Sequence, residues 1–397
     1  LSQIVQDHPL KPQKMTIFQT AMALVATNIG GGILGIPFAL QKMGLPLGMI
    51  FCLLMTIITH TSSMMYLKIK DLTPRKLESI YEIAFLMFGR SSIFIICTVL
   101  LLTNFGAIVL YYMMIGETVS TLTKQALIEP SGERSIAQMD IDLSEYPWWV
   151  QVGTSKATGT VVAGLLHLSV IFKRQLEEMA VISYALAFIV VIFTVLIYSM
   201  LFSEDELTVD LDEMMRVKTD YHLVTAFSIV IFAFSIQFMV LPAYTELEKR
   251  SNQRFATVSI LSTFLYSAAF LGVGVCGVLL FGEELETPNL LMNLSSRSGA
   301  VSVFCRSAFC FVLMFHVPYY FFLVKEYSLV IFDEICSRSM STKLEAKLAD
   351  FYKSIDHGSE PSTKKHAEEH PVVNNPDENY TLESLADGAD EADKMLP

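Results

Sequence analysis

The chain carries eight long runs of hydrophobic residues, separated by polar segments. The runs cover residues 16–40, 46–69, 92–123, 157–172, 178–202, 221–241, 255–281 and 299–324. About 20 apolar residues in a helix cross the roughly 30 Å hydrocarbon core of a bilayer. The pattern therefore predicts an all-α polytopic membrane protein with about eight crossings. Hydrophobic residues make up 52% of the chain and charged residues only 17%, which is typical of that class.

The polar segments alternate in charge, and the alternation predicts an orientation. Lys and Arg gather before the first run and after the second, fourth and sixth runs, whereas acidic residues gather after the third, fifth and seventh. Because basic loops stay in the cytosol, the N-terminus and the C-terminal tail are expected there. Much of the net charge of −12 lies in the tail. A strongly acidic tail repels nucleic acid, so no nucleic-acid partner is expected.

The distribution of apolar residues predicts four regions. They are a cytosolic N-terminal segment (1–15), a transmembrane domain (16–331), a cytosolic amphipathic segment (332–356) and a disordered acidic tail or loop (357–397). Residues 342–355 place apolar side chains at helical spacing, which predicts a short helix that lies on the membrane or the loops, or binds a partner. The chain begins with Leu1 and no apolar run follows Phe332, so we expect a fragment.

The first apolar run contains a sequence that breaks a helix. Residues 27–37 include three consecutive glycines, Gly30, Gly31 and Gly32, followed by Pro37. These residues destabilise a helix by several kcal/mol, and lipid supplies no water to bond the freed backbone groups. Close helix packing would explain two spaced glycines but not this run. The break is therefore predicted to face a cavity or a ligand.

The sixth run shows a weaker form of the same feature. Small and polar residues occupy its middle and Pro242 follows, but no glycine marks a break. Transporters built from two inverted halves begin each half with a discontinuous helix. A spacing of five helices between the two breaks is what a five-plus-five inverted repeat requires.

Several motifs combine with these breaks. They are the segments 28–39, 81–82, 88–89, 104–107, 115–117, 232–234, 241–247, 281–282 and 290–294, with Arg306, Pro318 and Lys325-Glu326. Together they resemble the amino acid/auxin permease family, and within it the neutral amino acid transporters of the system A and system N type. The resemblance covers about residues 16 to 330. It implies a leucine-transporter-like inverted-repeat fold, here truncated after the eighth helix as a fragment or, alternatively, a degenerate relative.

The expected substrate site follows from the chemistry of an amino acid. Freed N–H groups of the glycines beside a half-helix N-terminus suit its carboxylate, and carbonyls of the sixth span suit its ammonium group. In the third span, Asn104 and either Tyr111 or Tyr112 could line the cavity, although a tyrosine can also anchor a helix at the membrane interface. The predicted substrate-binding residues are Asn28, Ile29, Gly30, Gly31, Gly32, Asn104, Phe232, Ala233, Phe234 and Ser235.

Coupling to an ion gradient, either proton or sodium, is expected, and the residues differ from the sodium-coupled pattern. Sodium-coupled members of the family that this chain resembles have an Asn in the first span and a hydroxyl residue in the eighth. This chain has Ala26 and Met314 at those two positions. Backbone carbonyls of Ala26 and Ile29 could still hold sodium. His316 precedes Pro318 by two residues and is a candidate for proton transfer. Proton coupling therefore competes with sodium coupling.

Other function classes find less support. No nucleophile, metal cluster or acid–base pair forms a recognisable motif, so neither an enzyme nor a bound metal or cofactor is expected. The alternative to secondary active transport is an amino acid sensor, or a transporter-like subunit of a larger membrane assembly. The expected location is the plasma membrane or a vacuolar or lysosomal membrane.

Overall fold

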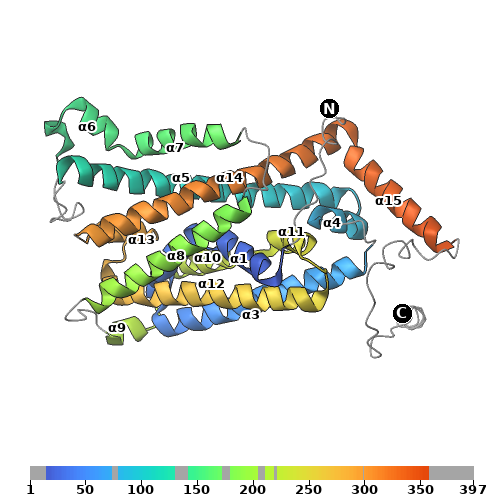
Figure 1. Ribbon diagram of the computed structural model, residues 1–397, viewed down its shortest axis with the longest axis horizontal. Helices are drawn as coiled ribbons and strands as arrows, with labels where there is room; N and C mark the ends of the chain where they lie inside the picture. The colour runs from blue at the N-terminus through green and yellow to red at the C-terminus, as the bar shows by residue number, and fades with distance from the viewer. Residues whose placement is uncertain are drawn as a thin grey trace. The chain divides into compact units, whose positions relative to one another are not determined.

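The computed structural model confirms an all-α protein (Figure 1). It describes residues 15–73, 79–129, 142–171, 179–203, 211–218, 221–297 and 299–356. Two units separate, Leu1–Leu344 and Glu345–Pro397. The predicted N-terminal segment, apart from residue 15, and the predicted acidic tail lie outside the described residues.

In the described ranges, every regular element is a helix. The α-helices are α1 (Ile17–Asn28), α2 (Gly31–Met43), α3 (Leu45–Asp71), α4 (Ile80–Phe88), α5 (Ser91–Ile128), α6 (Trp148–Gly153), α7 (Lys156–Ile171), α8 (Met179–Phe202), α9 (Leu211–Met215), α10 (His222–Ala233), α11 (Gln237–Glu246), α12 (Asn252–Phe281), α13 (Leu290–Leu294), α14 (Ala300–Ser337) and α15 (Ser339–Asp356). Two short 3-10 turns, η2 (Leu143–Glu145) and η3 (Gly282–Glu284), complete them.

Each of the eight predicted runs coincides with a helix or a pair of helices. Five apolar spans among the described residues are long enough to cross a membrane, and the pair α1 and α2 provides a sixth. Of the two further helices, α7 has 16 residues and α8 has 24. These spans confirm a polytopic membrane protein. The amphipathic segment predicted at 342–355 is helical within α15.

Both predicted breaks are present. α1 begins with a capping box, in which the Thr16 hydroxyl accepts from the Gln19 amide and the Gln19 side chain accepts from the Thr16 amide. It ends at Asn28, and α2 continues from Gly31 after a bend of 62°. In the sixth span, α10 ends at Ala233 and α11 begins at Gln237. Residues 29–30 and 234–236 therefore carry backbone outside any helix.

The longest helices form an antiparallel pair beside this broken core. α5 and α14 each have 38 residues and run along one another (Figure 1). At one end of the pair, Arg90 bonds the carboxylate and the backbone carbonyl of Glu334, whose side chain is fully buried. The amide of Ser341 also donates to that carboxylate, at 3.0 Å. This end of the pair is thereby fixed to the start of α15.

Candidate substrate site

A small cavity lies between the two helix breaks. Its wall comes from the α1–α2 and α10–α11 breaks together with α5, α11 and α14, and consists of Asn28, Gly32, Thr103, Asn104, Tyr111, Phe232, Ala233, Ser235, Phe238 and Tyr320. The predicted substrate residues in this wall are Asn28, Gly32, Asn104, Phe232, Ala233 and Ser235. Every side chain in the wall is uncharged. The structure thus brings both breaks to one polar but neutral cavity.

Two asparagines in the cavity wall carry polar atoms without a hydrogen-bond partner in the described chain. Asn28 is the last residue of α1, and its buried Nδ2 has no hydrogen-bond partner in the described chain. Asn104 is 1% exposed; its Nδ2 donates to the Leu100 carbonyl at 2.6 Å, while its Oδ1 is left without a partner there. A buried polar atom without a partner costs about 1–3 kcal/mol. The cavity therefore offers a donor and an acceptor to a polar ligand.

The three glycines serve different purposes. A Cβ on Gly32 would lie 3.0 Å from the Cα of Ala233, so this glycine lets α2 approach α10 closely beside the cavity. A Cβ on Gly31 would lie 2.5 Å from Cε1 of Tyr111, and one on Gly30 would meet the Tyr111 hydroxyl. The Tyr111 hydroxyl interacts with the Gly31 amide and with Tyr320. Of the amides predicted to hold a carboxylate, that of Gly31 is thus covered by Tyr111, which lies in the cavity wall rather than at an interface.

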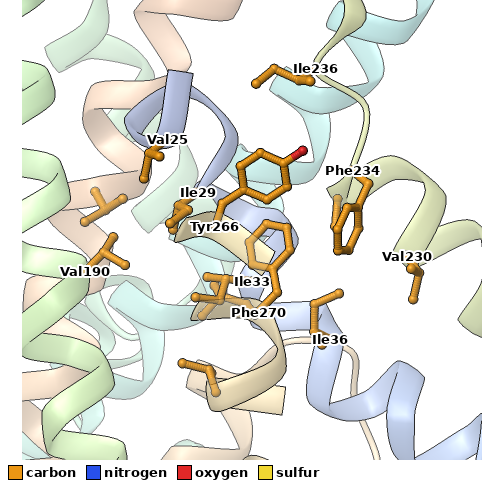
Figure 2. Close-up of a cluster of buried hydrophobic side chains, with 14 of the residues drawn as sticks. Val25, Ile29, Ile33, Ile36, Val190, Val230, Phe234, Ile236, Tyr266 and Phe270 are labelled. Carbon is orange, nitrogen blue, oxygen red and sulfur yellow. The ribbon is translucent and has the colours of Figure 1, made fainter. Parts of the chain in front are cut away.

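Two predicted substrate residues belong to the apolar core beside the cavity. Figure 2 shows Ile29 and Phe234 among buried hydrophobic side chains, and they are 3% and 0% exposed. The Phe234 ring contacts Tyr266 and Phe270 edge-on, with ring centroids 5.7 and 5.3 Å apart. Neither Ile29 nor Phe234 lines the cavity. Their side chains instead fix both breaks against the core.

The carbonyls of the second break are partly occupied. The Phe234 carbonyl accepts from the Thr59 hydroxyl of α3 and from the Ile236 amide, each at 3.1 Å. The Phe232 carbonyl accepts from the Ser235 amide, also at 3.1 Å, while the Ser235 hydroxyl bonds back to Ile231. The predicted role of these two carbonyls as acceptors for an ammonium group therefore requires a shared or exchanged bond.

At the first break, a histidine side chain contacts the backbone carbonyl that the break leaves free. The Gly30 amide bonds the Asn28 carbonyl at 3.0 Å instead of the Ala26 carbonyl, which a regular helix would use. The Ala26 carbonyl lies 2.8 Å from Nε2 of His316, and Nδ1 of the same ring lies 2.8 Å from the Val312 carbonyl. A neutral imidazole has one N–H and donates to one of them, whereas an imidazolium donates to both. His316, which is 2% exposed, is therefore placed to hold a proton.

A second histidine satisfies a carbonyl that a proline leaves unpaired. Pro318 lacks an N–H, so α14 provides no donor to the Met314 carbonyl. Nε2 of His167 lies 2.7 Å from that oxygen, and its Nδ1 lies 3.0 Å from the Tyr112 hydroxyl. His167 is 3% exposed and ties α7 to α5 and α14. It is a hydrogen-bonded packing residue.

Sequence reasoning missed three residues of the cavity wall, Thr103, Phe238 and Tyr320. Thr103 precedes Asn104, and that neighbour is the one signal that could have found it. The two aromatic residues have no distinguishing sequence context. Only the crossing of α11 and α14 beside the breaks brings them to the cavity.

Comparison with known families decides the affiliation of the chain. Residues 13–375 match the sequence model of a family described as transmembrane amino acid transporter protein. The chain belongs to this family. The resemblance based on the motifs of the first and sixth spans is confirmed, and the family is one of transporters.

Individual transmembrane amino acid transporters share about a quarter of their residues with the chain. Amino acid transporter AVT6E of Arabidopsis thaliana is 24% identical over 81% of this chain and 65% of its own length. Vacuolar amino acid transporter 7 of Saccharomyces cerevisiae is 25% identical over 74% of this chain and 56% of its own length. Sodium-coupled neutral amino acid transporter 7 of Xenopus laevis is 22% identical over 53% of this chain and 43% of its own length. The chain spans less than two thirds of the length of these relatives.

Proposed function

We propose that this chain takes part in the secondary active transport of neutral amino acids, which it holds between the α1–α2 and α10–α11 breaks. The cavity between these breaks carries the proposal. Asn28 offers an unpaired donor for a carboxylate, and Asn104 offers an unpaired acceptor for an ammonium group. The uncharged wall suits a substrate whose side chain is neutral. The family supports amino acid transport in general.

Contact between a substrate carboxylate and the Gly31 amide requires Tyr111 to move. Its hydroxyl covers the Gly31 amide, so a carboxylate reaches that amide only when Tyr111 turns toward the space lined by Phe238 and Tyr320. The Gly31 amide then contributes a further donor, whereas the Gly30 amide already donates to the Asn28 carbonyl. Substrate binding is thus linked to a rotation of one aromatic side chain.

The proposed coupling ion is a proton carried by His316. Its two nitrogens lie between two carbonyl acceptors, and a protonated ring donates to both of them. The Ala26 carbonyl, predicted as a sodium ligand together with Ile29, is already in contact with this ring. The thioether of Met314 is a poor ligand for sodium. One relative is described as sodium-coupled, so sodium coupling is the alternative to be tested.

The proposed orientation and location rest on charge and on relatives. The basic loops support a cytosolic N-terminus and tail, and a relative described as vacuolar supports a vacuolar or lysosomal membrane over the plasma membrane. The two breaks, five predicted spans apart, support an inverted repeat of the leucine-transporter-like type.

Uptake into proteoliposomes tests the proposal. Purified protein is reconstituted, and entry of a 14C-labelled mixture of the twenty amino acids is followed with a pH gradient, with a sodium gradient and with neither. The expected result is uptake of neutral amino acids driven by the pH gradient, lost in Asn104→Leu and retained in Asn252→Leu, which changes a half-buried asparagine at the start of α12, bonded to Asp71 and remote from the cavity wall. Binding without uptake would overturn transport in favour of a sensor.

A further inference from the structure

A second, wider cavity opens where α2 and α12 end. Its wall comes from α2, α9, the end of α12, η3 and the segment before α14, and consists of Gln41, Glu213, Met214, Lys218, Leu280, Phe281, Gly282, Glu283, Glu284 and Arg297. We call it the Gln41 cavity. Its empty volume, counted out to the open solvent at its mouth, is about 780 Å³, against about 370 Å³ for the cavity between the breaks. Nothing in the transport site described above uses it.

Gln41 gives this cavity an unsatisfied acceptor. The residue lies in the last turn of α2 and is only 7% exposed, yet its Oε1 is buried without a hydrogen-bond partner in the described chain. Burying the unpaired amide oxygen of a glutamine costs free energy, and an apolar side chain at this position would avoid that cost. The missing partner must be a donor, because an amide oxygen only accepts.

Charges of both signs surround this acceptor. Glu283 and Glu284 are exposed at the mouth, and Glu213 pairs with Lys218 at 3.6 Å. Arg297 donates to the Leu280 carbonyl at 2.6 Å, with its guanidinium group 5.4 Å from the centre of the Phe281 ring. The cavity therefore presents carboxylates and fixed cations together.

This combination identifies the class of ligand. In the described part of the chain no three acidic, histidine or cysteine side chains come together closely enough to hold a metal ion. The carboxylates are spread around a wall that also holds two cations, and such a wall suits a small organic zwitterion.

The position of the cavity relates it to the substrate site. Gln41 and Gly31 lie on the same helix, ten residues apart, which corresponds to about 15 Å at 1.5 Å per residue. A zwitterion held at Gln41 therefore waits about three turns of α2 away from the first break, at the membrane face where that helix ends.

We propose that the Gln41 cavity is a second binding site for the α-amino acid, which is occupied before the substrate reaches the breaks. The ammonium group of the amino acid donates to Gln41 Oε1 and faces Glu283, while its carboxylate faces Arg297 and Lys218. The identity of the ligand rests on the proposed function, whereas the existence of a zwitterion site rests on this cavity alone.

Counting bound amino acids tests the proposal. The full chain in nanodiscs is equilibrated by dialysis against the 14C-labelled mixture of twenty amino acids, and bound label per chain is measured. We expect two equivalents for the wild type. One is expected for Gln41→Met, which keeps the length of the side chain, and one for Gly31→Val, which blocks the central site. Uptake by Gln41→Met should show a KM raised about tenfold with kcat unchanged.

Matched acid variants isolate the cavity. Glu283→Gln should also weaken the second equivalent about tenfold, whereas Glu286→Gln, an exposed acid three residues away that does not line the cavity, should leave it unchanged. One equivalent in the wild type, or two in Gln41→Met, would overturn the second site. If Gly31→Val keeps the equivalent that Gln41→Met loses while no form shows uptake, the second site stands and the proposed transport fails.

Discussion

The two helix breaks face the same cavity but are closed by different chemistry. At the first, the carbonyl freed by the bend, that of Ala26, meets the ring of His316. At the second, the Phe234 carbonyl meets the hydroxyl of Thr59. A hydroxyl keeps its proton at every physiological pH, whereas an imidazole can gain and lose one. The first break can therefore respond to pH, and the second is expected to stay constant.

The most severe test of this difference is to fill the first break. Gly31→Val places a Cβ 2.5 Å from Tyr111, so the ring and α2 cannot keep their contact. We expect amino acid uptake and central binding to be abolished while the protein still inserts and elutes as a folded species. Gly106→Val is the matched control, because a Cβ there meets nothing within 4 Å. Normal uptake by Gly31→Val would show that the glycines only permit packing.

The pH response of the first break can be removed without filling it. His316→Gln retains a donor for the Ala26 carbonyl but cannot titrate. We expect wild-type uptake to rise as the pH on the side of substrate entry falls, because protonated His316 donates to both carbonyls. In the variant, the ratio of uptake at pH 5.5 and 7.5 should approach one, while binding survives. An unchanged ratio would place the coupling group elsewhere.

The second break should lose stability without losing its pH profile. Thr59→Val removes the hydroxyl that bonds the Phe234 carbonyl, and Thr59 is fully buried. A hydrogen bond of this kind contributes about 1 kcal/mol, so thermal unfolding should shift by a few degrees. Uptake should keep the wild-type dependence on pH. A flattened profile in this variant would erase the proposed difference between the breaks.

The smallest effect is expected from removing the Tyr111 hydroxyl, which lies beside the glycines. Tyr111→Phe keeps the ring in place but removes the oxygen that interacts with the Gly31 amide. That amide then has no competitor for the substrate carboxylate, and affinity should rise about threefold, the equivalent of a weak hydrogen bond. Equilibrium dialysis with the labelled mixture measures it. A loss of affinity would mean that the hydroxyl contacts the substrate itself.

The sequence predicts the spans and the breaks better than it predicts the cavity wall. Gly30, Pro37 and Pro242 act on the backbone within a few residues of their own position, so their consequences can be read locally. The cavity wall instead depends on how separate helices cross. The sequence predicts that the Phe234 carbonyl contacts substrate, but it does not predict that the Phe234 ring packs against Tyr266 in the apolar core.

The position of Tyr111 in the cavity wall is likewise not predicted by local sequence. A tyrosine in an apolar helix is typical of a membrane interface, and the cavity was the other possibility left open by the sequence. Only the antiparallel approach of α14 to α5 brings Tyr320 and His316 to its ring and fixes it over the glycines. Contacts between residues about 200 positions apart follow from tertiary packing, and no local pattern encodes them.

The lengths of α5 and α14 have a mechanical consequence. Each helix has 38 residues and is about 57 Å long, nearly twice the thickness of the hydrocarbon core. Tyr111 and His316 lie near the midpoints of these two rods, and Arg90 and Glu334 lie near one pair of ends. A rotation of about 10° around the midpoint shifts each end by about 5 Å but barely displaces the centre. The pair can thus act as a lever whose fulcrum is the cavity between the two breaks.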